Sequence, residues 1–215
     1  MIKTGEGSIA WNSFSECSDL KKVVWIENGI QTVIGSTSEE VVVDKGKDLL
    51  YRKQRLIFLN PNKPNRTVNV TLHLPTFEPL ACTDHGQRNV YLDYHSNEVE
   101  VAFEEEGIEN TNKHVLEDGV FDLFSIELIL RLLPLENGYK NEIKAFNHMV
   151  NDTVIVRIEV LGLEKIFDGA REVDAWCVSV YIGESLQTYW VSKDLKELLK
   201  QSVKIGDGVF FEFVR

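Results

Sequence analysis

Apolar and polar residues alternate along much of the chain, and this alternation predicts β-strands. In residues 66–74 four aliphatic residues fall on one face and four polar residues on the other, the period of a half-buried strand. Residues 49–59 form a further apolar strand with a basic centre, and 30–34 and 40–43 form two short strands around a turn at 35–37. Strands that follow one another through short turns pair antiparallel, because parallel neighbours need a long crossover.

Three more pairs of apolar runs flank short turns and predict β-hairpins. The pairs are 89–95 with 98–104, 143–150 with 153–161, and 173–182 with 187–192. A last strand covers residues 209–214. The sequence therefore predicts a mainly β protein, with a single curved antiparallel sheet or half-barrel built as a meander of hairpins.

Residues 122–133 have the composition of a buried helix. Asp122 can cap the start of this helix, and Pro134 stops it. Apolar residues surround nearly the whole helix axis, so the sheet must curl around it. Glu127 and Arg131 lie four residues apart in the favourable order, which predicts an exposed ion pair.

Length and composition favour a single domain over residues 1–215, with the first 20–25 residues irregular. The chain is 43% apolar and 27% charged, which is typical of a globular protein. A second, weaker helix is predicted over 193–201, where a turn between strands fits equally well. The sequence has no apolar run long enough for a membrane span and no apolar signal segment near its start. We expect a cytoplasmic protein, or one from which an export signal was removed.

The formal net charge of −11 argues against a nucleic-acid partner, because phosphate contacts need clustered lysine and arginine. Segment 98–122 holds nine acidic residues, Glu106 among them, and one basic residue. Segment 44–66 holds seven basic and two acidic residues. We interpret the acidic segment as a solvated face and the basic one as an edge strand that resists further pairing. The two faces could instead contact a protein partner.

Few residues are candidates for metal binding or catalysis. The candidate metal ligands are His73, Cys82, His85 and His95, although their spacing matches no zinc motif. Of the three cysteines, none forms a CxxC pair, and we expect reduced thiols. Cys177 alternates with apolar strand residues and is expected to be an inert core thiol. The sequence has no glycine-rich phosphate loop, so we expect no cofactor.

Aromatic residues gather on one predicted hairpin and suggest an apolar pocket. Trp176 and Trp190 share a face if the turn is centred near Gly183. The alternative is that these side chains only pack on the helix as core. The candidate ligand-binding residues are Trp176, Tyr181, Tyr189 and Trp190 on the hairpin, and Phe124 and Leu128 on the helix.

Several short motifs follow one another in a fixed order through the second half of the chain. They are 121–125 (FDLFS), 130–135 (LRLLPL), Gly138, 174–180 (DAWCVSV), 188–193 (TYWVSK) and 197–201 (ELLKQ). Through them, residues from about 75 to 215 resemble a bacterial family of uncharacterised proteins, domain of unknown function 3108. The resemblance implies a long, strongly curved antiparallel sheet around a helix, similar to periplasmic lipoprotein carriers. It implies no known activity and no catalytic residues.

Three functions are compatible with the sequence. The first is a non-enzymatic binding module that holds an apolar or lipid-like small molecule between the curved sheet and the helix. The second is a structural or protein-interaction domain that uses the acidic and basic faces. The third is a metal-assisted hydrolase that uses His73, His85 and His95.

Overall fold

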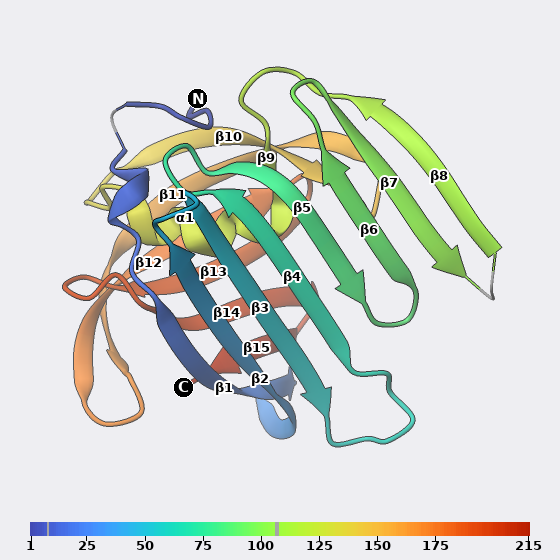
Figure 1. Ribbon diagram of the computed structural model, residues 1–215. Helices are drawn as coiled ribbons and strands as arrows, with labels where there is room; N and C mark the ends of the chain where they lie inside the picture. Colours follow the sequence, from blue (N-terminus) through green and yellow to red (C-terminus); the bar gives the residue numbers. More distant parts are fainter. Residues whose placement is uncertain (8, 106–107) are drawn as a thin grey trace.

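The computed structural model of the protein describes residues 1–7, 9–105 and 108–215 (Figure 1). It contains strands and very little helix. The helical elements are η1 (Trp11–Ser13), η2 (Leu123–Ser125) and α1 (Ile126–Leu132). The strands are β1 (Cys17–Glu27), β2 (Ile30–Asp44), β3 (Leu49–Phe58), β4 (Arg66–His73), β5 (Glu78–His85), β6 (Asn89–Tyr94), β7 (Glu98–Glu105), β8 (Ile108–Val115), β9 (Phe121–Asp122), β10 (Lys140–Asn147), β11 (Asp152–Phe167), β12 (Glu172–Ile182), β13 (Ser185–Ser192), β14 (Leu198–Gly206) and β15 (Val209–Val214).

All these strands belong to one sheet, in the order β8-β7-β6-β5-β4-β3-β2-β1-β15-β14-β13-β12-β11-β10-β9. The first strand pairs with the last, and each half of the chain then runs outward from this central pair. Neighbouring strands are antiparallel except for β9 and β10, which are parallel. The predicted curved antiparallel sheet around one buried helix is therefore confirmed.

The sheet curls around α1, which lies between the strands of the first half and those of the second half (Figure 1). Strands near the two ends of the sheet contact each other through their side chains. The hydroxyl of Tyr94 in β6 donates a hydrogen bond to Asp122 in β9 at 2.5 Å. The ring of His114 in β8 lies 5.4 Å from that of Phe146 in β10. Packing and hydrogen bonds between side chains thus hold the rolled sheet around the helix.

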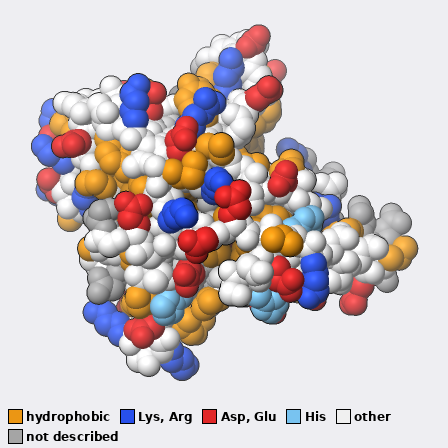
Figure 2. Space-filling view, turned by 90° about the horizontal axis from the view of Figure 1, so that it is seen from above, with side chains coloured by type: hydrophobic (Ala, Val, Ile, Leu, Met, Phe, Trp, Pro, Cys, Tyr) orange, Lys and Arg blue, Asp and Glu red, His pale blue; other side chains and the backbone are white. Residues whose placement is uncertain are grey.

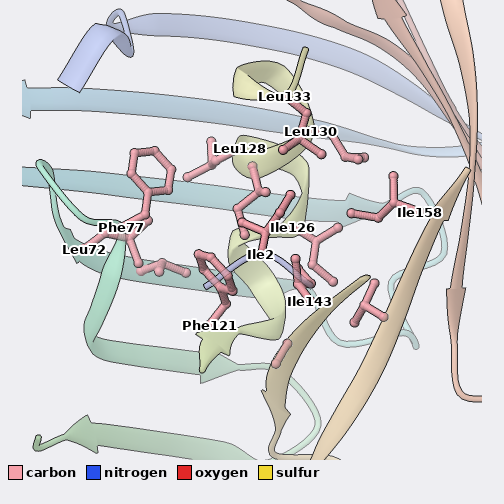
Figure 3. Close-up of a cluster of buried hydrophobic side chains, with 14 of the residues drawn as sticks. Ile2, Leu72, Phe77, Phe121, Ile126, Leu128, Leu130, Leu133, Ile143 and Ile158 are labelled. Atoms are coloured by element: carbon pink, nitrogen blue, oxygen red, sulfur yellow. The ribbon is translucent and has the colours of Figure 1, made fainter. Parts of the chain in front are cut away.

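The core fills the space between the helix and the inner face of the sheet (Figure 3). Leu128, Ile129 and Leu130 of α1 are completely buried there. The irregular N-terminal segment is shorter than the predicted 20–25 residues, because β1 begins at Cys17, and its described residues belong to the same core. Ile2 forms a parallel bridge with Ile143, and Trp11 is buried. Burial of these apolar side chains is the main force that holds the sheet against the helix.

Asp122 and Pro134 mark the two ends of the helical segment, as predicted. The polar face of the helix, however, is buried. Asp122 accepts a hydrogen bond from the Phe124 N–H at 2.7 Å, and the backbone becomes extended again at Leu133, directly before Pro134. The α-helix itself begins only at Ile126, because the preceding turn is a 3-10 helix. The prediction of an exposed Glu127–Arg131 ion pair is wrong. The sheet surrounds the helix, and the side chains of both residues are at least 85% buried.

Three other predictions need correction. The segments 30–34 and 40–43 belong to one 15-residue strand, β2. Gly35 is not a turn residue: a Cβ there would lie 2.3 Å from the Ile57 carbonyl oxygen, so the close approach of β3 requires glycine. Of the two alternatives for residues 193–201, the helix is wrong and the turn between strands is correct, followed by the start of β14. The basic strand β3 lies between β2 and β4 and is not an edge strand.

The described parts of the chain include no helix with the length and apolarity needed to cross a membrane. The assignment of residues 1–215 to one domain stays a prediction, which the single sheet supports.

We expect Leu130→Ala to lower the free energy of unfolding by about 2–5 kcal/mol, because it leaves a cavity in the core beside the helix. Leu195→Ala is the matched control, since Leu195 is 63% exposed, and it should change stability by less than about 0.5 kcal/mol. Urea denaturation of both variants measures the difference. Similar losses in the two variants would contradict the position of Leu130 in the core.

Candidate ligand-binding site

A cavity of about 260 Å³ lies inside the curled sheet, next to the start of α1. Strands from both halves of the chain line it, together with η2 and the first turn of α1. Its polar lining residues are Arg52, Gln54, Arg66, Glu127, Gln187, Tyr189 and Gln201. Its apolar lining residues are Leu123, Phe124, Ile126, Ile182, Val203, Ile205, Phe211 and Phe213. Polar and apolar groups therefore meet in one partly open cavity.

Three polar side chains from β13 and β14 form a hydrogen-bonded group in the cavity wall. The register places Tyr189 opposite Gln201. The Tyr189 hydroxyl donates to Gln187 Oε1 at 2.5 Å, and Gln201 Nε2 donates to Gln187 Oε1 at 3.0 Å and to the Tyr189 oxygen at 3.1 Å. Burial raises the pKa of Tyr189 well above its ordinary value. The phenol is thus neutral and can act as both donor and acceptor.

Arg52 projects from β3 into the interior, where its side chain is 1% exposed. Its Nη1 donates to the backbone carbonyl of Phe124 at 2.5 Å. Its Nη2 donates to Glu39 Oε2 of β2 at 2.9 Å and also to the Glu127 carboxylate of α1. Its Nε has no hydrogen-bond partner among the described residues. One guanidinium therefore connects β3 to β2, to the turn before the helix and to the helix itself.

The two carboxylates that share Arg52 differ in their affinity for protons. Burial would raise the pKa of Glu39, but Arg52, together with Lys21 and Arg131, outweighs burial and lowers it. For Glu127, burial is the stronger effect and raises the pKa in spite of Arg52. Burial opposes the charge of Arg52 too, but Glu127 and Glu39 together raise its pKa. Arg52 and Glu39 thus carry opposite charges, while Glu127 is the carboxyl that takes up a proton more readily.

A second ion pair lies beside the ring of Phe124. Arg66 of β4 donates two hydrogen bonds to Asp84 of β5, at 2.8 and 2.7 Å, and its guanidinium carbon lies 5.1 Å from the centre of the Phe124 ring. His148 Nε2 is 3.2 Å from Asp84 Oδ2. Burial would raise the pKa of Asp84, but Arg66 and His148 outweigh it and lower the pKa. Both arginines that line the cavity are therefore already paired with carboxylates.

The predicted ligand-binding residues divide among three places. Phe124 and Tyr189 line the cavity. Leu128 and Trp176 are buried in the core. Trp190 and Tyr181 lie on the outer face, where the Trp190 Nε1 donates to Glu164 at 2.8 Å and Tyr181 faces an open groove. Trp176 and Trp190 do not share a face, because the two-residue turn pairs Cys177 with Trp190 and Trp176 with Val191.

Several residues that line the cavity were not predicted from the sequence, although sequence patterns indicated some of them. Arg52 and Gln54 lie in phase with the buried Leu50, on the inner face of β3. Phe211 and Phe213 are two residues apart on β15, so they point to the same face, with ring centroids 5.1 Å apart. Gln187 and Gln201 carried no signal, because only the pairing of β13 with β14 brings them together.

The four candidate metal ligands are not brought together. Cys82 is buried on the inner face of β5, whereas His73 and His85 are on the opposite face of β4 and β5. His73 Nδ1 is within hydrogen-bond distance of Thr76 Oγ1, and His85 Nδ1 of Asn89 Oδ1. His95 follows β6 and is exposed. Within residues 1–7, 9–105 and 108–215, no group of three or more His, Cys, Asp or Glu side chains is arranged to hold a metal ion.

The buried cysteines are thiols rather than thiolates. Burial raises the pKa of Cys177 to about 12, and Glu164 adds to this effect. Burial also raises the pKa of Cys82 well above its ordinary value, with Asp122 and Asp84 adding to it. A thiol with a raised pKa is a poor nucleophile at neutral pH.

The two charged segments do not lie wholly on the surface. Arg52 of the basic segment and Asp122 of the acidic segment are both buried. Glu106 lies outside the described residues. On the face shown in Figure 2, acidic and basic side chains are interspersed and do not form separate patches.

Residues 60–214 match the family described as "Protein of unknown function (DUF3108)". The chain belongs to the DUF3108 family. The match includes β4 to β15 and leaves out β1 to β3, which carry Arg52 and Glu39. A search of curated proteins found no match to this DUF3108 protein.

The fold is similar to that of a solved protein of another uncharacterised family. That structure is described as the "Beta-barrel-like Protein of Domain of Unknown Function DUF1849 from Brucella abortus". The two chains are 12% identical, and the TM-score is 0.55 over 91% of this chain and 93% of the other. At this identity the similarity concerns the fold alone.

We expect Arg52→Met to lower the free energy of unfolding by about 3–5 kcal/mol at neutral pH, because it leaves two buried carboxylates without their cation. Burial already raises the folded-state pKa of Glu127, and the variant removes Arg52, the strongest effect that opposes this rise. The folded state then binds more protons, so the stability lost in the variant should be partly regained as the pH falls from about 7 to about 5.

Arg55→Met is the matched control for this experiment, because Arg55 lies on the exposed face of the same strand. Urea denaturation at several pH values measures both variants. A loss for Arg52→Met that equals the loss for Arg55→Met, or that grows as the pH falls, would contradict the charge arrangement.

We expect Asp84→Asn to be less stable than the parent protein at neutral pH by about 1–3 kcal/mol, because the contacts with Arg66 and His148 lose their negative partner. The pKa of Asp84 is lowered by folding, so its contribution is present above its ordinary value of 3.8 and lost as the pH falls below it. The difference between the two proteins should therefore shrink in acid. Thermal denaturation from neutral pH downward, with the exposed Asp207→Asn as control, measures it.

Proposed function

We propose that this DUF3108 protein is a non-enzymatic binding module for a small molecule with a short apolar part and an uncharged polar end. The observation that carries the proposal is the cavity of about 260 Å³ between the sheet and the start of the helix. Small-molecule sites are typically enclosed, mostly apolar, and provided with a few polar groups that fix orientation.

The apolar part of the ligand would lie against the side chains of β14 and β15. Val203, Ile205 and Phe211 lie on these two strands, and Phe213 packs against Phe211. Ile205 is 57% exposed, which places the entrance to the cavity on this side. Contact with these residues would remove apolar ligand surface from water, at about 25 cal/mol per Å².

The polar end of the ligand would meet amide and hydroxyl groups rather than a free charge. Gln187, Tyr189 and Gln201 supply neutral donors and acceptors. Arg52 and Arg66 are each paired with carboxylates, so a carboxylate ligand would find no net positive charge to offset its own. An alcohol or amide fits this wall without needing such an offset.

The cavity volume limits the size of the ligand. Sites for drug-sized molecules span roughly 300–1,000 Å³, slightly more than this cavity offers. We therefore propose a ligand with one short chain rather than a whole phospholipid. Of the other two functions, the interaction domain stays a prediction. The hydrolase has less support, since its three histidines are not brought together.

The proposal is tested by thermal denaturation with two ligands of the same chain length, 1-octanol and octanoate. 1-Octanol should raise the melting temperature more than octanoate does, because a ligand that binds only the folded state stabilises it, by about 2.7 kcal/mol at a hundred times its Kd. Equal stabilisation by octanoate would contradict the proposal that the polar end of the ligand is uncharged.

A variant that fills the cavity distinguishes binding at this site from unspecific effects. Val203→Trp should abolish the stabilisation by 1-octanol, since the larger side chain occupies the ligand's place. Ile155→Trp, on the exposed face of β11, should retain it. Stabilisation that persists in the Val203→Trp variant, or that is absent in the unmodified protein, would overturn the proposed function.

A further inference from the structure

The two edge strands of the sheet differ in how well they are protected from pairing with another strand. At one end, β9 has only two residues, and both are buried. At the other end, β8 has eight residues and pairs with β7 alone. Figure 1 shows β8 at the free margin of the sheet. The outer edge of β8 thus offers a row of backbone donors and acceptors for another strand.

Strand β8 lacks most of the features that normally prevent pairing at an edge. It contains no proline, and its register with β7 runs through eight residue pairs without a bulge. Every residue of β8 except His114 is exposed. Its one lysine, Lys113, is held by Glu98 and Glu100 of β7 at 3.0 and 3.2 Å. The edge is therefore regular, accessible and long enough to pair.

The charges on one face of β8 are arranged symmetrically. Glu109, Thr111 and Lys113 alternate along the strand and share a face. Within the chain, Glu109 lies directly opposite Glu104 of β7, and like charges in this position are unfavourable. A positive group on the outer side of Glu109 would relieve this repulsion.

We propose that β8 pairs antiparallel with β8 of a second copy of this chain, with a twofold axis at Thr111. In this register Glu109 of each copy lies opposite Lys113 of the other, so that two cross-strand pairs of opposite charge form. An antiparallel register shifted by two residues in either direction places Thr111 opposite Lys113 or Glu109 and loses both pairs. Charge complementarity thus selects one register, independently of the proposed ligand site.

The expected dimer is in equilibrium with the monomer. Eight residues of strand extend about 27 Å, and a single pair of strands buries less than the roughly 1,200 Å² typical of stable complexes. Sedimentation velocity should therefore show a mass that rises with protein concentration toward that of a dimer. A monomer at every concentration up to the millimolar range would overturn the proposal.

A charge reversal tests the pairing without disturbing the hairpin. Glu109→Lys places like charges opposite one another between the copies, but a favourable pair with Glu104 within each chain. The dissociation constant should rise about tenfold, from the loss of two cross-strand pairs. Glu184→Lys, in the exposed turn between β12 and β13, makes the same change in net charge and should have little effect. Equal effects of the two variants would overturn the proposal.

Cross-linking tests the register. Thr111→Cys should form a disulfide-linked dimer under mild oxidation, because the two substituted positions face each other across the axis. In Val115→Cys the two positions are eight residues apart along the paired strands, about 27 Å, and should not link. The three native cysteines are present in both variants. Linkage at position 115 as fast as at position 111 would overturn the proposed register.

Discussion

The position of the helix depends on the buried guanidinium of Arg52. A charge in the interior must be paired and hydrogen-bonded, and the partners of Arg52 come from β2, the turn before the helix and the helix itself. Such a group adds little net stability compared with an apolar replacement, but each missing partner is costly. A shift of the seven-residue helix would separate Arg52 from the Phe124 carbonyl and from Glu127. The cavity follows from this, since the start of the helix forms one of its walls.

The pairing of β1 with β15 makes the whole chain one sheet. The family match begins at residue 60, yet β1 to β3 lie in the middle of the strand order and supply Arg52 and Glu39. Of these strands, β3 lines the cavity with Arg52 and Gln54, and β2 supplies Glu39 as a partner of Arg52. The similarity to the DUF1849 protein covers 91% of this chain, which agrees with a fold that includes the first three strands.

Local patterns predicted much of the local structure, although they did not indicate β1, β5, β8 or β14. Alternation located the hairpins, and Asp122 with Pro134 located the helix, because these signals act within a few residues. The predictions failed where the burial of a residue depends on segments that are distant in the sequence. Glu127 and Arg131 have the pattern of an exposed pair, but strands far away in sequence cover them. Arg52 was grouped with surface lysines and arginines, although its phase with Leu50 marked the inner face. The cavity could not be predicted, because it depends on how strands from both halves of the chain curve around the helix.

The central strand pair also affects how the protein is made. Lys22 pairs with Val214, so contacts at the middle of the sheet join residues from opposite ends of the sequence. Folds dominated by such long-range contacts form slowly, since much of the chain must be ordered before they close. During synthesis, the apolar helix is complete well before β15 leaves the ribosome. Until then, the helix and the inner faces of the early strands remain uncovered, so the nascent chain is a natural client for chaperones that shield apolar surface.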